Sequence, residues 1–297
     1  MKVLVTGAGG YIGRHVVKRL VENGNDVIAS DFNADGIDYR ASFCNAPIFD
    51  GDKDIFKKLG HPDACIHLAW RDGFVHDSRA HMQDLSKHMI FLQNMIDGGL
   101  PSLTVMGTMH EIGYWEGAID EHTPCNPLSQ YGIAKNAMRQ SLVLLEQRAN
   151  FTLHWLRAFY ITGDDMKAQS IFSKIAKAVD EGKKEFPFTT GKNKYDFIDV
   201  DDLAKMIVAA SLQNKIKGII NVCSGKPISL AERVEAFIKD HNYNIKLKYG
   251  AFPDRIYDSP EVWGDNKKIE TIMHNLNEEN KFKEDNNKVD GNGFSRA

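Results

Sequence analysis

The sequence predicts an α/β fold in which a doubly wound parallel sheet is followed by a smaller C-terminal α/β lobe. Three observations support this prediction. Short apolar runs alternate with longer segments of helical periodicity in the first half of the chain, which is typical of a parallel sheet covered by helices on both faces. A glycine-rich turn separates the first strand from the first helix. The chain has 297 residues, of which 42% are hydrophobic, so it can bury a large core.

The first half of the chain contains the most regular alternation of elements. Residues 3–5 predict a strand, and residues 11–22 predict a helix because apolar residues recur there at helical spacing. The further elements expected are strands at 25–30, 64–68, 103–106 and 151–156 and helices at 82–96 and 129–148.

The second half is less regular. Ser229 is placed to cap a helix, with Glu232 three residues later as its capping-box partner. The elements expected here are helices at 171–181, 202–212 and 229–240 and strands at 196–200 and 218–222.

These elements divide the chain into a larger domain and a smaller lobe. We assign residues 1–165 to the larger domain, with 195–225 returning to it, and residues 166–194 and 226–275 to the smaller lobe. Residues 276–297 contain almost no apolar side chains, so we predict a disordered tail there.

The composition excludes several classes of protein. The net charge of −3 comes with no basic stripe, which argues against a nucleic-acid partner. No apolar run reaches the roughly 18 to 20 residues of a membrane span, and no secretory signal is evident at the start. The four cysteines are widely separated and form no metal-ligand or disulfide pattern. A cytoplasmic protein without a metal site is therefore expected.

The segment Thr6 to Gly13 carries glycines at GxxGxxG spacing, directly after the first strand. Gly7 permits the tight turn, Gly10 lets the backbone approach a pyrophosphate, and Gly13 lets the helix pack closely on the sheet. Backbone N–H groups and the helix dipole would then hold the phosphates. With Tyr11 and Ile12, these glycines form the predicted dinucleotide-binding turn of a Rossmann-type domain.

Asp31 ends the second strand, 18 positions after Gly13. A carboxylate there can accept hydrogen bonds from both hydroxyls of the adenosine ribose, whereas it would repel a 2′-phosphate. This favours NAD(H) as the cofactor. Arg14, next to the last glycine, could soften that preference, so NADP(H) stays possible.

Tyr131 and Lys135 lie four residues apart on one face of the helix expected at 129–148. A nearby ammonium favours a phenolate, so Lys135 is predicted to lower the pKa of Tyr131 from its reference of about 10. A tyrosine of this kind can exchange a proton with a substrate oxygen.

Together these motifs resemble the extended short-chain dehydrogenase/reductase family, in its nucleotide-sugar branch. The order of motifs is that of the family: the glycine turn, Asp31, His67-Leu68-Ala69 after a later strand, Thr108, and the YxxxK pair. Asp50 resembles the family acid that meets the adenine. The resemblance covers about residues 1 to 275.

Further motifs lie in the second half of the chain. Residues 156–163 resemble an LRxxNxxG segment and residues 196–204 resemble RDFIHVDDLA, but Tyr160 replaces the usual asparagine and Tyr195 the usual arginine. Arg255 and Asp258 fit an RxxD element that meets the substrate diphosphate and ribose. Residues 221–225 and 265–268 match the family's NVGSG and DxxK elements.

The resemblance implies a role for each site residue. Tyr131 would be the acid/base, Lys135 would hold the nicotinamide ribose, and Thr108 would hydrogen-bond the reacting oxygen. Leu68 and Ala69 would contact the cofactor. The residues implied in substrate binding are Thr108, His110, Tyr160, Arg255 and Asp258.

The residues after Thr108 help to choose among the family's reactions. Its 4,6-dehydratases carry Asp-Glu there for the elimination, and this chain has Met109-His110, so dehydration is disfavoured. His110 and Glu111 are expected at the mouth of the site. The favoured reaction is NAD(P)H-dependent reduction of a nucleotide-linked 4-keto-6-deoxy hexose, with dTDP as the expected nucleotide. Such an enzyme would feed a surface polysaccharide or a glycosylated metabolite.

Two other functions stay open. One is a nucleotide-sugar 4-epimerase that holds NAD tightly, and the other is a non-catalytic protein that senses dinucleotides. The resemblance also implies a homodimer formed through the helices at 82–96 and 129–148.

Overall fold

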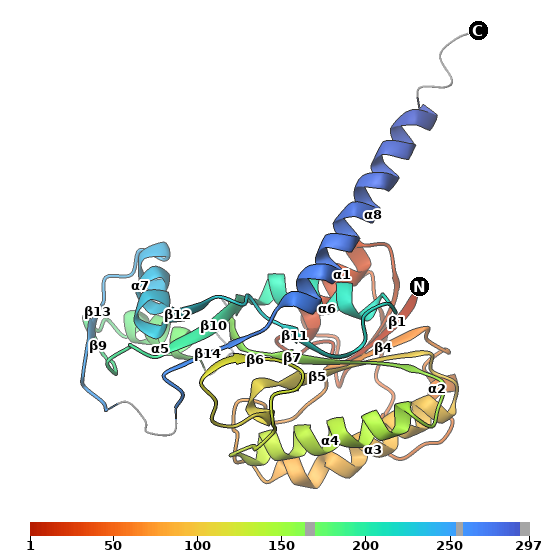
Figure 1. The fold of residues 1–297 in the computed structure, drawn as a ribbon, viewed down its shortest axis with the longest axis horizontal. Coiled ribbons are helices and arrows are strands. Elements are labelled where there is room, and N and C mark those ends of the chain that lie inside the picture. Colours follow the sequence, from red (N-terminus) through yellow and green to blue (C-terminus); the bar gives the residue numbers. More distant parts are fainter. Residues whose placement is uncertain (164–169, 254–257, 292–297) are drawn as a thin grey trace.

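The computed structural model describes residues 1–163, 170–253 and 258–291 (Figure 1). Within them, the main sheet has seven strands, all parallel, in the order β11-β7-β5-β4-β1-β2-β3. The strand order reverses between β1 and β4, which is the switch point where ligands bind in open α/β sheets. The predicted Rossmann-type fold class is confirmed. The strands are β1 (Lys2–Thr6), β2 (Asp26–Ser30), β3 (Ser42–Cys44), β4 (Ala64–His67), β5 (Ser102–Thr108), β7 (Thr152–Ala158) and β11 (Gly218–Val222).

Helices cover both faces of this sheet because successive strand residues point to opposite sides. In β1, Val3 and Val5 join the core under α1 (Gly13–Glu22) and α6 (Val200–Ser211), whereas Leu4 joins the core on the other face. That other face is covered by α2 (Ile55–Lys58), α3 (Ala80–Asp97) and α4 (Gln130–Glu146), which lie below the sheet in Figure 1.

The smaller lobe is built on a second sheet with the path β12-β10-β14-β6. The helices α5 (Ile171–Asp180) and α7 (Leu230–Asp240) enclose the core of this lobe, and Ser229 caps α7 as predicted. Strand β8 also pairs with β10 but is not part of this strand order, and β13 and β9 form a separate two-stranded sheet. The strands are β6 (Gly117–Ile119), β8 (Tyr160–Thr162), β9 (Glu185–Pro187), β10 (Lys194–Asp199), β12 (Pro227–Ser229), β13 (Lys246–Lys248) and β14 (Glu261–Gly264).

Asp196 of β10 joins the two sheets, and its side chain is fully buried. Its carboxylate accepts hydrogen bonds from the backbone N–H of Ser224 at 2.9 Å, of Gly225 at 2.9 Å and of Gly264 at 3.1 Å. The Ser224 hydroxyl donates a fourth at 2.5 Å. One side chain therefore connects β10 to the end of β11 and to β14.

The C-terminal part differs from the predictions in two ways. Helix α8 (Lys267–Gly291) begins within residues assigned to the smaller lobe, yet Ile269 and Ile272 pack into the core of the larger domain. The helix then continues through most of the segment predicted to be a disordered tail and extends away from the body (Figure 1). The apolar start of α8 is held by the core, and polar residues extend the helix from it, with a Lys281–Glu278 pair on its surface.

No helix in the described ranges has the length and apolar character needed to cross a membrane.

Candidate active site

The glycine-rich turn between β1 and α1 is tightly packed. Gly7 has a φ of 68°, and a Cβ there would lie 2.7 Å from the amide nitrogen of Ala69. A Cβ at Gly13 would collide with the carbonyl oxygen of Gly7, because α1 begins directly against the turn. Bare backbone at the helix N-terminus, with Gly10 exposed, suits a pyrophosphate. The residues predicted to bind the cofactor here, Gly7, Gly10, Tyr11, Ile12 and Gly13, all lie in this turn or at the start of α1.

Asp31 stands beside this turn at the end of β2. Its carboxylate accepts hydrogen bonds from the backbone N–H of Gly9 at 2.8 Å and of Phe32 at 2.7 Å. The acidic group is thus held next to the glycine turn, where a ribose diol could reach it.

The other predicted cofactor residues lie in the segments that follow β4 and β3. Leu68 and Ala69 follow β4, and the Ala69 backbone N–H donates to Thr6 Oγ1 at 3.4 Å. Asp50 is exposed in the turn that follows β3, and its neighbour Phe49 packs edge-on against His88 with ring centroids 4.6 Å apart.

Thr108, Tyr131 and Lys135 meet at the carboxyl end of β5. Thr108 is the last residue of β5, and the other two lie one turn apart at the start of α4. The Thr108 side chain lies close enough to the Tyr131 hydroxyl to lower its pKa. Lys135 Nζ donates to the carbonyl oxygen of Met106 at 2.9 Å. The fold therefore brings together the three residues that the sequence singled out for catalysis.

The predicted effect of Lys135 on Tyr131 is wrong for this structure. Burial raises the pKa of Tyr131 above its ordinary value of 10.0, and the negative charge of Glu111 raises it further, against the lowering effect of the Thr108 hydrogen bond. The Lys135 ammonium lies 5.9 Å from the Tyr131 ring centroid, turned toward Met106. Burial lowers the pKa of Lys135 itself to about 7.

A loop after β4 adds aromatic groups that the sequence analysis missed. The centroid of the Trp70 ring lies 3.7 Å from the Lys135 ammonium, and the His76 ring is stacked on Tyr131 at 5.5 Å and 12°. The backbone N–H of Tyr131 donates to the His76 carbonyl oxygen at 2.9 Å. An irregular segment carries no periodicity, so no signal in the sequence pointed to these contacts. In the described part of the chain, no three His, Cys, Asp or Glu side chains gather to hold a metal ion.

Glu111 differs from the expectation that it lies at the mouth of the site beside His110. Glu111 is fully buried: it accepts hydrogen bonds from the backbone N–H of Thr108 at 2.8 Å and from Trp155 Nε1 at 3.0 Å. Arg157 lies 3.6 Å from the carboxylate. Burial raises the pKa of Glu111, while Arg157 and the hydrogen bonds from Thr108 and Trp155 oppose that shift, so Glu111 is a structural carboxyl group behind Thr108. His110 is half-buried, and burial of its ring lowers its pKa to about 3, so the ring is neutral at pH 7.

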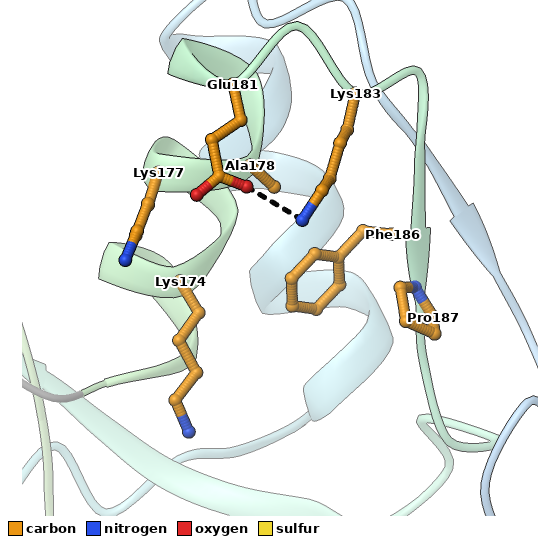
Figure 2. Close-up of a pocket in the computed structure, with 7 residues that line it drawn as sticks. All are labelled: Lys174, Lys177, Ala178, Glu181, Lys183, Phe186 and Pro187. Atoms are coloured by element: carbon orange, nitrogen blue, oxygen red, sulfur yellow. Dashed lines mark ion pairs between the residues drawn. The ribbon is translucent and has the colours of Figure 1, made fainter.

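A separate hollow lies in the smaller lobe, between α5 and β9, with a volume of about 310 Å³ (Figure 2). Three lysines line it together with Phe186, and Lys183 is paired with Glu181 at 2.7 Å. None of the predicted site residues within the described ranges lines this hollow, so it is not part of the candidate active site.

The profile of the NAD dependent epimerase/dehydratase family matches residues 3–223, which include the glycine turn, the trio and the buried Asp196. The chain belongs to this family. The predicted family resemblance is therefore confirmed, as are the predictions of an enzyme and of NAD as its dinucleotide.

Individual relatives of this family extend over most of the chain. The dTDP-6-deoxy-L-talose 4-dehydrogenase (NAD(+)) of Aggregatibacter actinomycetemcomitans is 46% identical, covering 89% of this chain and 99% of that protein. A putative UDP-glucose 4-epimerase of Methanocaldococcus jannaschii is 28% identical over 91% of this chain and 92% of its own. The crystal structure of the Thermus thermophilus UDP-glucose 4-epimerase in complex with NAD shares the fold, with a TM-score of 0.77 at 21% identity, covering 91% and 92% of the two chains.

The two departures from the family motifs lie together in the smaller sheet. The rings of Tyr160 and Tyr195 are 4.4 Å apart, because β8 and β10 are paired neighbours. Burial raises the pKa of Tyr160 above its ordinary value, with smaller contributions from Tyr195 and Asp258. Asp258 is therefore close enough for its charge to reach Tyr160. Arg255 lies outside the described residues.

Proposed function

We propose that this enzyme transfers a hydride reversibly at C4 of a nucleotide-linked 6-deoxy hexose, with reduction of the 4-keto sugar as the favoured direction. The similarity to dTDP-6-deoxy-L-talose 4-dehydrogenase carries the proposal, because it extends over 89% of this chain. That protein's name describes the same oxidation-reduction at the same carbon. A dTDP-linked sugar is accordingly the proposed substrate.

Thr108, Tyr131 and Lys135 would carry out the proton chemistry. The glycine turn and Asp31 would hold NADH, which would provide the hydride for reduction of the C4 carbonyl carbon. The Tyr131 hydroxyl donates its proton to the carbonyl oxygen, so that the product is an alcohol and the tyrosine becomes a phenolate. Thr108, whose side chain lies close to the Tyr131 hydroxyl, would orient the reacting oxygen. The Lys135 ammonium would stabilise the phenolate until a proton from solvent restores it.

The protonated Tyr131 hydroxyl is suited to the proton-donor role that the proposed reduction requires. Because burial raises its pKa, the hydroxyl keeps its proton at neutral pH and is ready to donate it. The reverse oxidation needs the phenolate, which is costly in this buried site.

The remaining site residues have proposed roles in binding. Asp31 would bind the adenosine ribose, and Asp50 would contact the adenine. Arg255 and Asp258 would meet the substrate diphosphate and ribose, since a guanidinium suits phosphate oxygens. Tyr160 would line the sugar site.

The first experiment follows NADH and NADPH absorbance with a panel of dTDP-linked 4-keto-6-deoxy sugars. Stoichiometric oxidation of NADH by one of them is expected, with slower oxidation of NADPH because Asp31 repels a 2′-phosphate. Tyr131→Phe serves as the inactive control. Tightly held NAD with interconversion of C4 epimers and no net consumption would contradict the reductase and identify an epimerase.

We also propose that the enzyme is a homodimer formed through α3 and α4. These adjacent helices leave apolar side chains exposed, namely Met82 and Ile90 on α3 and Ile133 and Leu144 on α4. Apolar side chains on one helix pair are suited to an isologous interface. Light scattering should give twice the chain mass of 33.4 kDa. Ile90→Lys should give the single-chain mass, and a wild-type monomer at micromolar concentration would refute the dimer.

A further inference from the structure

Lys135 has two direct partners besides the groups proposed for catalysis. Its Nζ donates to the Met106 carbonyl oxygen at 2.9 Å, and the same atom lies 3.7 Å from the centroid of the Trp70 ring. An ammonium at this distance over an indole face is attracted by the ring's negative quadrupole, most strongly when water is excluded. Lys135 is only 3% exposed, so the contact is desolvated.

Trp70 is itself held on two sides. Its ring stacks on His88 with centroids 4.6 Å apart and 23° between the planes. Its Nε1–H donates to His81 Nδ1 at 3.0 Å. Since that nitrogen accepts, His81 Nε2 carries the hydrogen and donates to the Val75 carbonyl oxygen at 2.9 Å. The indole is therefore fixed in plane and in position.

The histidines around this contact do not compete with the ammonium. Burial lowers the pKa of His67 well below 6.5 and that of His88 to about 3, so both rings are neutral at pH 7. Their hydrogen bond, at 2.9 Å between His67 Nε2 and His88 Nδ1, continues to Thr6 through His67 Nδ1 at 2.8 Å. Thr6, His67 and His88 thus form an uncharged chain of hydrogen bonds that runs from the start of the glycine turn to the ring stacked on Trp70.

We propose that Trp70 is a positioning residue that holds the Lys135 ammonium in place for the nicotinamide ribose. An ammonium has three N–H donors, and the Met106 carbonyl uses one of them. The π face takes a second N–H without bringing a competing acceptor atom, so the third stays available for a ribose hydroxyl. This inference rests on the proposed function only in assigning Lys135 to the bound dinucleotide.

Two variants separate the π face from the rest of the indole. Trp70→Phe keeps an aromatic face and loses the N–H that bonds to His81, whereas Trp70→Leu keeps apolar bulk and loses the face. By calorimetry, Trp70→Leu should weaken NAD⁺ binding by about 10- to 30-fold, and Trp70→Phe by less than about 3-fold. With a sugar that the wild type converts, Trp70→Leu should lower kcat and leave the KM for the sugar nearly unchanged.

A double-mutant cycle with Lys135→Met tests whether Trp70 acts through the lysine. In that background, Trp70→Leu should have no further effect on NAD⁺ affinity. The inference is overturned if Trp70→Leu binds NAD⁺ like the wild type, if both Trp70 variants are weakened equally, or if the loss persists in the Lys135→Met background. These titrations need no sugar, so a wild type that turns over none of the sugars refutes the proposed function alone.

Discussion

Two of the rings packed around Tyr131 belong to histidines that carry no charge at neutral pH. The His76 ring lies parallel to it, and burial lowers the pKa of His76 below 6.5. The His110 ring also packs on His76, with centroids 4.2 Å apart. In this environment the tyrosine holds its proton firmly, and Lys135 is the cation nearest to it among the groups described. The groups that surround the Tyr131 hydroxyl are therefore different from those that contact the Lys135 ammonium, namely Met106 and Trp70.

Removing the Tyr131 hydroxyl should abolish most of the activity and leave cofactor binding intact. Tyr131→Phe is expected to lower kcat by about 100- to 10,000-fold, the usual value of acid/base assistance, because the proton donor is lost. NAD⁺ affinity, measured by calorimetry, should change by less than about 3-fold. Tyr114→Phe is the matched control, since that exposed hydroxyl bonds only to Glu116 among the contacts described. Retention of a tenth of the activity by Tyr131→Phe would exclude its role.

The lowered pKa of Lys135 predicts that dinucleotide affinity depends on pH. Burial sets the pKa near 7 in the cofactor-free protein, so the ammonium is lost as pH rises through 7. Because the ammonium is the form that donates to a ribose, NAD⁺ affinity should be highest below pH 7. It should fall above that pH by at most about tenfold per unit. Titrations between pH 6 and 9 test this, and Lys135→Met should give a flat profile. A flat wild-type profile would contradict the prediction.

At the level of elements, the two sheets are connected by a buried carboxylate. Asp196 lies on β10, whereas its donors lie at the end of β11 and on β14, 28 to 68 residues away. Charged hydrogen bonds of this kind are worth more than neutral ones because they form in a medium of low dielectric. The smaller lobe is thereby held against the carboxyl ends of the main strands, where the proposed sugar site lies.

Loss of the Asp196 carboxylate should destabilise the whole enzyme. Asp196→Ala leaves the amides of Ser224, Gly225 and Gly264 without their acceptor, at an expected cost of about 3 kcal/mol or more in the free energy of unfolding. Asp199→Ala, at the end of the same strand, removes only the exposed cap of α6 and should cost about 1 kcal/mol. Urea denaturation measures both. Equal effects of the two substitutions would show that Asp196 is not the connecting residue.

At the level of the whole molecule, the first residues of α8 complete the hydrophobic core of the larger domain. Ile269 and Ile272 are buried in it, and Leu276 is partly buried against it. Beyond them, Glu279 reaches back to Lys215 at 3.9 Å, and the helix then stands clear of the body (Figure 1). The chain therefore returns to its first domain at its C-terminal end.

Truncation after residue 280 should leave the fold intact. The shortened chain is expected to keep its melting temperature within about 2 °C, because the α8 residues described as packed on the core lie before the cut. Ile272→Ala in the full chain should instead lower the free energy of unfolding by about 2 to 5 kcal/mol through the cavity it creates. Thermal and urea unfolding give both values. A large loss on truncation would show that the far part of α8 has a partner.

Much of the fold and of the candidate site was predictable from local pattern. The alternation of strands and helices indicated the parallel sheet, because side-chain period reports which face is buried. The glycine turn, Asp31, Thr108 and the Tyr131–Lys135 spacing indicated the site, because each motif has a short-range geometric cause. The family profile then agreed with those motifs over residues 3–223.

The sequence by itself determined which fold forms and which residues gather at the end of β5, since periodicity, glycine spacing and one helical turn are local properties. Only the tertiary structure decided the pKa values of those residues and the side chains that they contact. Burial raises the pKa of Tyr131, Lys135 turns to Met106 and Trp70, and Glu111 lies buried beneath the site. Desolvation and ring contacts depend on segments far apart in the chain, so no local pattern encodes them.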